Sequence, residues 1–236
     1  MRRTRWTFLG AVACLVLAVT RPDARPPTGP REQALDFTGI TQLRVESTGR
    51  VEIEIGGRAP AVTFSRQKDV QATVTREGDT LVVAIDAGGN RWHGTTIVTP
   101  AWLERIDARA SVAIEAKRPV ARMRIATTAP LAWDGAATSL EIRRRSHAHG
   151  DATHADAGDD ACTDHGVVDV EGKVDALVVV ADVGRVYVDR QRGHGHVTLD
   201  LTDGVTFDIE NALDLGGVTL RRRAPGVAAD TTGAMP

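Results

Sequence analysis

A short apolar pattern recurs along residues 106–209 at a nearly constant spacing, and this repeat is the strongest constraint on the fold. One series of apolar pairs has steps of 19, 37, 18 and 21 residues: Val112/Ile114, Leu131/Trp133, Val168/Val170, Val186/Val188 and Phe207/Ile209. A second series has steps of 19, 17, 37 and 20 residues: Ile106, Ile125, Ile142, Val179 and Leu199. Such a repeat predicts a β-solenoid, in which each coil buries its apolar face against the next.

The segment before the repeat also reads as strands. Residues 43–47 (LRVES) and 51–55 (VEIEI) alternate apolar and polar side chains around Thr48 and Gly49, which predicts a β-hairpin. The chain is rich in glycine (23) and proline (10), and no long window keeps the 3.6-residue apolar period of a helix. The sequence therefore predicts an all-β fold of 18–21-residue coils preceded by hairpin and strand segments.

The two 37-residue steps equal two periods each, so they predict one further, disguised coil. It would begin at HAHGDATHADAGDDACTDH (147–165), and it would place His147 and His165 at equivalent positions of adjacent coils, 18 residues apart. Neighbouring strands lie about 4.8 Å apart, close enough for two imidazoles to share one ion. The candidate ligands for Zn²⁺, Cu²⁺ or Ni²⁺ are His147, His149, His154, Cys162 and His165.

The same stretch has two other interpretations. The close Cys/His spacings of structural zinc sites are absent, and a solvated, loosely packed coil explains the many alanines equally well. Its aspartates lie near Arg143 to Arg145 in sequence, as in carboxylate-based polysaccharide enzymes of solenoid shape, but Asp is also a common turn residue: Asp156, Asp159, Asp160 and Asp164. We expect no catalytic residue and no enzymatic activity, with a polysaccharide-active enzyme as a distant alternative.

The ends of the chain differ from the repeat. Residues 1–20 combine Arg2, Arg3 and Arg5 with an apolar run of about fourteen residues, the pattern of a signal peptide. Residues 21–34 form a proline-rich linker, residues 35–223 the domain, and residues 224–236 a featureless tail. The signal predicts export to the periplasm or the cell surface. Lipidation at Cys14 is not expected, because Cys14 lies in the middle of the apolar run.

The charge balance excludes one class of partner. The chain has 29 Lys and Arg, and removal of the three N-terminal arginines leaves 26 against 31 Asp and Glu. No basic surplus remains to bind nucleic acid. Membrane contact is expected only through the N-terminal segment. An envelope or surface partner is expected but not identified, and self-association through exposed coil ends is left open.

Three segments resemble one known family. They are LDFTGITQLRVESTGRVEIEIGG (35–57), REGDTLVVAID (76–86) and TPAWLERIDARASVAIEA (99–116). Their order and spacing are similar to those of the head GIN domain, an auto-transporter adhesin head domain of exported bacterial proteins. The match rests on Phe37, Ile40, Leu43, Asp79-Thr80-Leu81, Pro100 and Leu103 to Ile106.

The resemblance covers about residues 35–220, and the chain departs from the family at its Ser-Gly-Ala turns. It implies a single-stranded, right-handed β-helix-like solenoid, an exported location and no catalytic residue. The sequence therefore predicts a non-catalytic binding, adhesion-like or structural module, with metal binding or sensing through residues 147–165 as the alternative.

Overall fold

The computed structural model describes residues 31–64, 70–86, 88, 94–146, 166–189, 195–210 and 217–225. Every regular element in these residues is a β-strand, which confirms the all-β prediction. The strands form one open, mixed 16-stranded sheet. This is coarser than the right-handed single-stranded β-helix that the repeat and the family resemblance imply. Within the described part of the chain, nothing qualifies as a membrane-spanning helix.

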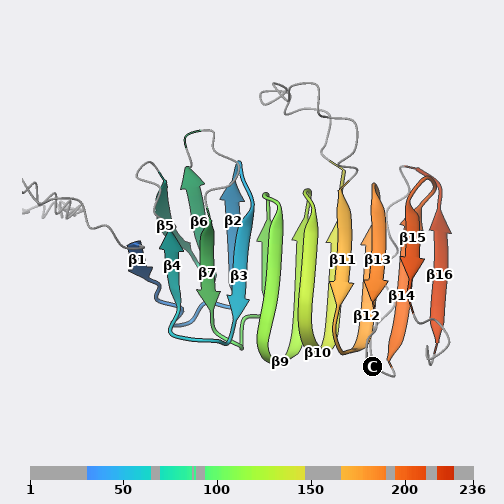
Figure 1. The fold of residues 1–236 in the computed structure, drawn as a ribbon, viewed down its shortest axis with the longest axis horizontal. Coiled ribbons are helices and arrows are strands. Elements are labelled where there is room, and N and C mark those ends of the chain that lie inside the picture. The colour runs from blue at the N-terminus through green and yellow to red at the C-terminus, as the bar shows by residue number, and fades with distance from the viewer. Residues whose placement is uncertain are drawn as a thin grey trace, which may run out of the picture.

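The sheet contains two long rows of parallel strands, joined because β9 and β10 each run through both (Figure 1). The first row consists of β7 (Thr95–Thr99), β3 (Val51–Ile55), the first parts of β9 (Val112–Thr127) and β10 (Leu131–Arg144), β11 (Val167–Glu171), β13 (Arg185–Asp189) and β15 (Thr206–Ile209). The second consists of β6 (Thr80–Asp86), β2 (Gln42–Ser47), β8 (Arg105–Ala108), the last parts of β9 and β10, β12 (Val174–Ala181), β14 (His196–Thr202) and β16 (Val218–Arg223).

Antiparallel strands flank the N-terminal end of both rows. β4 (Ala61–Phe64) pairs with β7, and β1 (Arg31–Ala34) pairs with β4. In the second row, β5 (Gln71–Glu77) forms a hairpin with β6. Its turn contains Gly78 at a φ of 65°, a left-handed conformation that glycine adopts at little cost.

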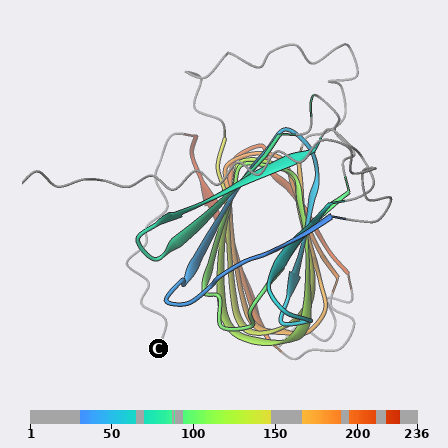
Figure 2. The same cartoon turned by 90° about the vertical axis from the view of Figure 1, so that its left-hand side faces the viewer.

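The two apolar series of the sequence are the two core ladders of the structure. In the first row Ile114 pairs with Trp133, Trp133 with Val170, and Val170 with Val188. In the second row Ile125 pairs with Ile142, Ile142 with Val179, and Val179 with Leu199. All of these side chains are buried. They line the space between the two rows, which face each other in the end-on view of Figure 2. The predicted register is therefore confirmed.

Two predictions about the strands are wrong. β2 and β3 form no hairpin: β2 pairs with β6 and β8 in the second row, and β3 pairs with β7 and β9 in the first. The further coil expected at residues 147–165 is also absent from the ladder, because β10 pairs directly with β11 and β12. The 37-residue step is thus a single step between neighbouring strands.

Candidate functional site

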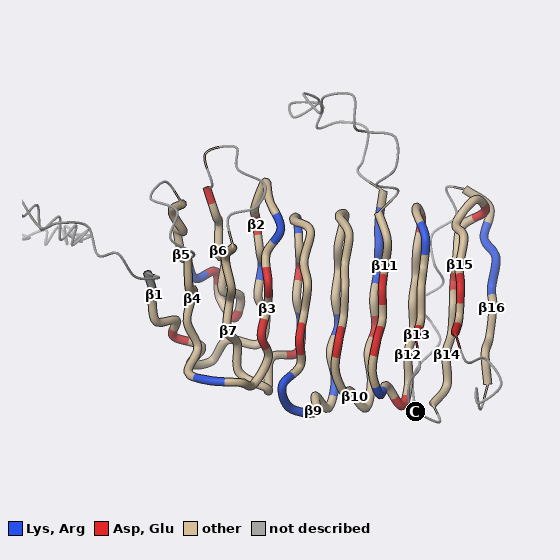
Figure 3. The backbone as a smooth tube through the Cα atoms, in the orientation of Figure 1, with Lys and Arg blue, Asp and Glu red and all other residues tan. Residues whose placement is uncertain are grey.

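The outward face of the first row carries a column of carboxylates in register. Glu54 on β3 lies opposite Glu115 on β9, and Glu115 lies opposite Asp134 on β10. Asp134 in turn lies opposite Glu171 on β11, and Glu171 opposite Asp189 on β13. Figure 3 shows these acidic segments recurring from strand to strand. Adjacent strands are about 4.8 Å apart, so the column places like charges close together over five strands.

A second column runs beside the first and contains a hollow. Its residues, in register, are Glu52, Ala113, Ala132, Asp169, Tyr187 and Asp208. The two alanines leave a depression of about 330 Å³ between Glu52 on one side and Asp169 on the other. Carboxylates of the first column border it along its length. We call the outward side chains of the two columns, together with Glu210, the acidic face.

The ionisation of the acidic face reflects this crowding. Burial, followed by the neighbouring charge of Asp189, raises the pKa of Asp169 above its ordinary value. Burial also raises the pKa of Glu171, with further contributions from Asp169, Asp134 and Asp189. A hydrogen bond to Glu210 is the main reason that the pKa of Tyr187 rises to about 12. Each shift shows that additional negative charge is unfavourable on this face.

Few cations offset these carboxylates. In the residues that the structure describes, the ion pairs on the acidic face join Lys117 to Glu115 and Arg185 to Asp208. The hydrogen bond from Glu115 is the main cause of the raised pKa of Lys117. Glu54, Asp134, Asp169 and Glu171 form no ion pair with any described residue.

The outward face of the second row is balanced instead. There Glu141 pairs with Arg143 at 2.5 Å and with Arg124 at 3.3 Å. Arg44 pairs with Glu77 at 2.9 Å and lies 3.8 Å from Asp107. The uncompensated acidic charge is therefore a property of one side of the molecule.

The metal ligands expected from the sequence lie outside the described residues. This holds for His147, His149, His154, Cys162 and His165, and for the four aspartates between them. The geometric argument that paired His147 with His165 no longer stands, because it required the extra coil. Among the residues that the structure does describe, no three His, Cys, Asp or Glu side chains converge on a metal position. The acidic face is thus an extended array rather than a chelating site.

The acidic face was missed by the sequence analysis, although a signal for it exists. An acidic residue directly follows the second member of every apolar pair in the first series: Glu115, Asp134, Glu171, Asp189 and Glu210. Once the apolar pairs are placed in register, these residues must form a column on the opposite side of the strands. Attention to the histidine-rich stretch obscured this regularity.

An all-β protein with stacked parallel strands and one acidic face is the class that these observations define. No protein-family model matches the chain, and no curated protein matches it. Among solved structures, it is similar to a "putative adhesin" from Bacteroides fragilis, with a TM-score of 0.46 and 12% identity over 83% of this chain and 93% of that one.

Two further solved structures are similar to the same extent. One is a "putative adhesin" from Parabacteroides merdae, with a TM-score of 0.45 and 8% identity over 85% of this chain and 96% of that one. The other is a "putative lipid binding protein" from Parabacteroides distasonis, with a TM-score of 0.44, 12% identity and the same coverage. Likeness at this level does not decide what this chain binds, and membership of the head GIN family stays a prediction.

Neutralising a carboxylate of the acidic face is expected to stabilise the protein. A like charge removed from a cross-strand pair is worth about 0.5 kcal/mol, so Asp169→Asn should raise the free energy of unfolding by that amount at pH 7. The pKa of Asp169 is raised in the folded state, so this group favours folding at low pH and loses that contribution as pH rises through the raised pKa. The gain should therefore disappear in acid. Urea denaturation of both proteins across this pH range measures it, and a loss of stability at pH 7 would contradict it.

Proposed function

We propose that this chain is an exported, non-catalytic binding module of the bacterial envelope, of the head GIN type, whose acidic face binds a cationic polypeptide. The signal-like residues 1–20 support export. The 18–21-residue steps of the two parallel ladders support a right-handed solenoid as the scaffold. Such a scaffold holds side chains in regular columns, which suits recognition of an extended partner.

The acidic column is the observation that carries this proposal. Like charges placed directly opposite one another on neighbouring strands destabilise a sheet. Glu54, Glu115, Asp134, Glu171 and Asp189 repeat this unfavourable arrangement over five strands with one lysine among them. Unfavourable local arrangements of this kind concentrate at functional sites, where the ligand relieves them. A positively charged ligand would relieve this one.

The hollow favours lysine and arginine side chains as the groups that are recognised. These side chains lay their aliphatic stems along apolar surface and keep the charged end in polar surroundings. The floor of the hollow is formed by Ala113 and Ala132, and Glu52 and Asp169 lie at its two sides. A basic side chain fits with its stem on the alanines and its charge between the carboxylates.

Binding of a fluorescent oligolysine peptide to the full chain tests the proposal. The double variant Asp169→Asn/Glu171→Gln removes two charges beside the hollow. At about 0.7 kcal/mol for each lost charge contact, the affinity should fall about tenfold. Fluorescence anisotropy at 50 mM and 300 mM salt measures the affinity, and binding should weaken at the higher salt because exposed charges are screened.

A matched variant separates the acidic face from net charge alone. Glu46→Gln/Asp107→Asn removes the same number of charges from the opposite, second row. It should bind the peptide as the unaltered protein does. Equal losses in both double variants, or no binding of the peptide at low salt, would overturn the proposal.

A further inference from the structure

The C-terminal end of the two rows exposes side chains that belong to the core ladders. Phe207, Val218 and Leu220 are 38%, 40% and 45% exposed. Their partners one strand earlier, Val186, Val197 and Leu199, are at most 1% exposed. The core positions of the last strands therefore lie open to solvent.

The backbone edges at this end are open as well. β15 pairs with β13 and β16 pairs with β14, and neither strand has a second strand partner in the described part of the chain. The N-terminal end differs, because the antiparallel strands β1, β4 and β5 lie there. Exposed edges with apolar side chains are sites at which another strand adds readily.

We infer that the end formed by β15 and β16 binds the same end of a second copy of this chain, with β15 of each copy paired to β16 of the other. The two strands belong to opposite rows and run in opposite directions (Figure 1). A twofold axis parallel to the strands, between the rows, places each β15 antiparallel to the partner's β16. Twofold dimers of this kind are the commonest assemblies of identical chains.

Charge complementarity selects this arrangement. β15 and the turn after it carry Asp208 and Glu210 on the outward side, whereas β16 carries Arg221 there. Pairing β15 with β16 brings acid to base on the outside and joins Phe207, Val218 and Leu220 on the inside. The other twofold arrangement, with the axis across the rows, would pair β15 with β15 and place carboxylates together.

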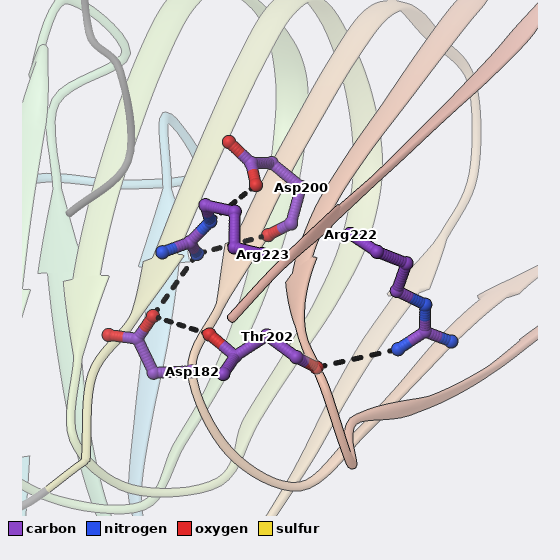
Figure 4. A network of polar contacts seen from close by, with 5 residues as sticks. All are labelled: Asp182, Asp200, Thr202, Arg222 and Arg223. Atoms are coloured by element: carbon purple, nitrogen blue, oxygen red, sulfur yellow. Dashed lines mark hydrogen bonds and ion pairs between the residues drawn. The ribbon is translucent and has the colours of Figure 1, made fainter. Parts of the chain in front are cut away.

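Arg221 is the guanidinium that this interface uses. Arg222 donates to the carbonyl of Val205 at 2.7 Å and lies over the Phe207 ring at 5.5 Å. Arg223 pairs with Asp200 and Asp182 (Figure 4). Arg221 forms no ion pair with another described residue.

Sedimentation equilibrium of the full chain over a range of concentrations tests the inference. A monomer–dimer equilibrium is expected, and either Leu220→Asp or Arg221→Glu should weaken it about tenfold or more. Trp102→Ser, which removes an exposed apolar side chain from another part of the molecule, should leave it unchanged. A thermal melt of each variant checks that the fold is retained.

A charge swap tests the pairing itself. Asp208→Lys alone should weaken the dimer, and Asp208→Lys combined with Arg221→Glu should restore it, because the two positions meet across the twofold axis. A chain that stays monomeric at 100 µM, assemblies larger than a dimer, or a dimer indifferent to Leu220→Asp and Arg221→Glu would each overturn the inference. The oligolysine affinity does not depend on this interface, so the two proposals fail separately.

Discussion

Replacing Trp133 with alanine is expected to lower the free energy of unfolding by about 3–5 kcal/mol, the usual cost of deleting a buried aromatic side chain. Trp133 is 1% exposed, and it lies between Ile114 and Val170 in the core ladder of the first row. Because strands on both sides pack against it, a cavity at this position cannot be closed by movement of one strand alone. Urea denaturation followed by far-UV circular dichroism measures the loss.

Trp133→Phe is the matched control. It keeps an aromatic ring in the ladder and removes the indole Nε1, which has no hydrogen-bond partner in the described part of the chain. A buried donor without a partner costs about 1–3 kcal/mol, so its removal should offset part of the lost packing. We expect Trp133→Phe to cost less than half as much as Trp133→Ala. A loss below about 1 kcal/mol for Trp133→Ala would show that the ladder does not depend on this side chain.

The core ladders could be predicted because their register is written in residue types. Each strand of the first row contributes two apolar side chains, separated by one outward residue. Stacking that keeps Ile114, Trp133 and Val170 buried permits one register, since a shift by one residue would turn every apolar side chain outward. The strand partners therefore followed from the sequence alone.

The extra coil could not be distinguished from an insertion by counting residues. Residues added at a corner of a stacked repeat leave the pairing of Ile142 with Val179 unchanged and cost little in loop entropy. Two periods and one period with an insertion therefore produce the same 37-residue step. The spacing of histidines in residues 147–165 was interpreted with the wrong one of these two possibilities.

The false hairpin has a related cause. Alternation of apolar and polar residues shows which side of a strand is buried, but it does not show which strand lies beside it. Val45 on β2 and Ile53 on β3 both face the core, from opposite rows. A turn that changes rows and a turn that forms a hairpin use the same small residues. The acidic face could have been predicted from the residues after each apolar pair, because its register is that of the core.

Replacing Arg223 with alanine is expected to cost about 3 kcal/mol at neutral pH, because it leaves a buried carboxylate without its cation. Arg223 is the last residue of β16, and its Nε lies 2.5 Å from Asp200 Oδ1, with side chains 11% and 10% exposed. Its second contact, 3.1 Å to Asp182, also links to the hydroxyl of Thr202 (Figure 4). These contacts attach the last strand to the stack.

The pH dependence of this loss identifies its cause. In Arg223→Ala, Asp200 is buried without its cation, which raises its pKa in the folded state above that in the unfolded chain. Such a group favours folding at low pH and loses that contribution as pH rises through the raised pKa, so the loss relative to the unaltered protein should shrink in acid. In Arg223→Met/Asp200→Leu no buried charge remains, and its stability should exceed that of Arg223→Ala at pH 7. A loss that is equal at pH 4 and pH 7, and that the double variant does not reduce, would show that Arg223 holds β16 through packing rather than through charge.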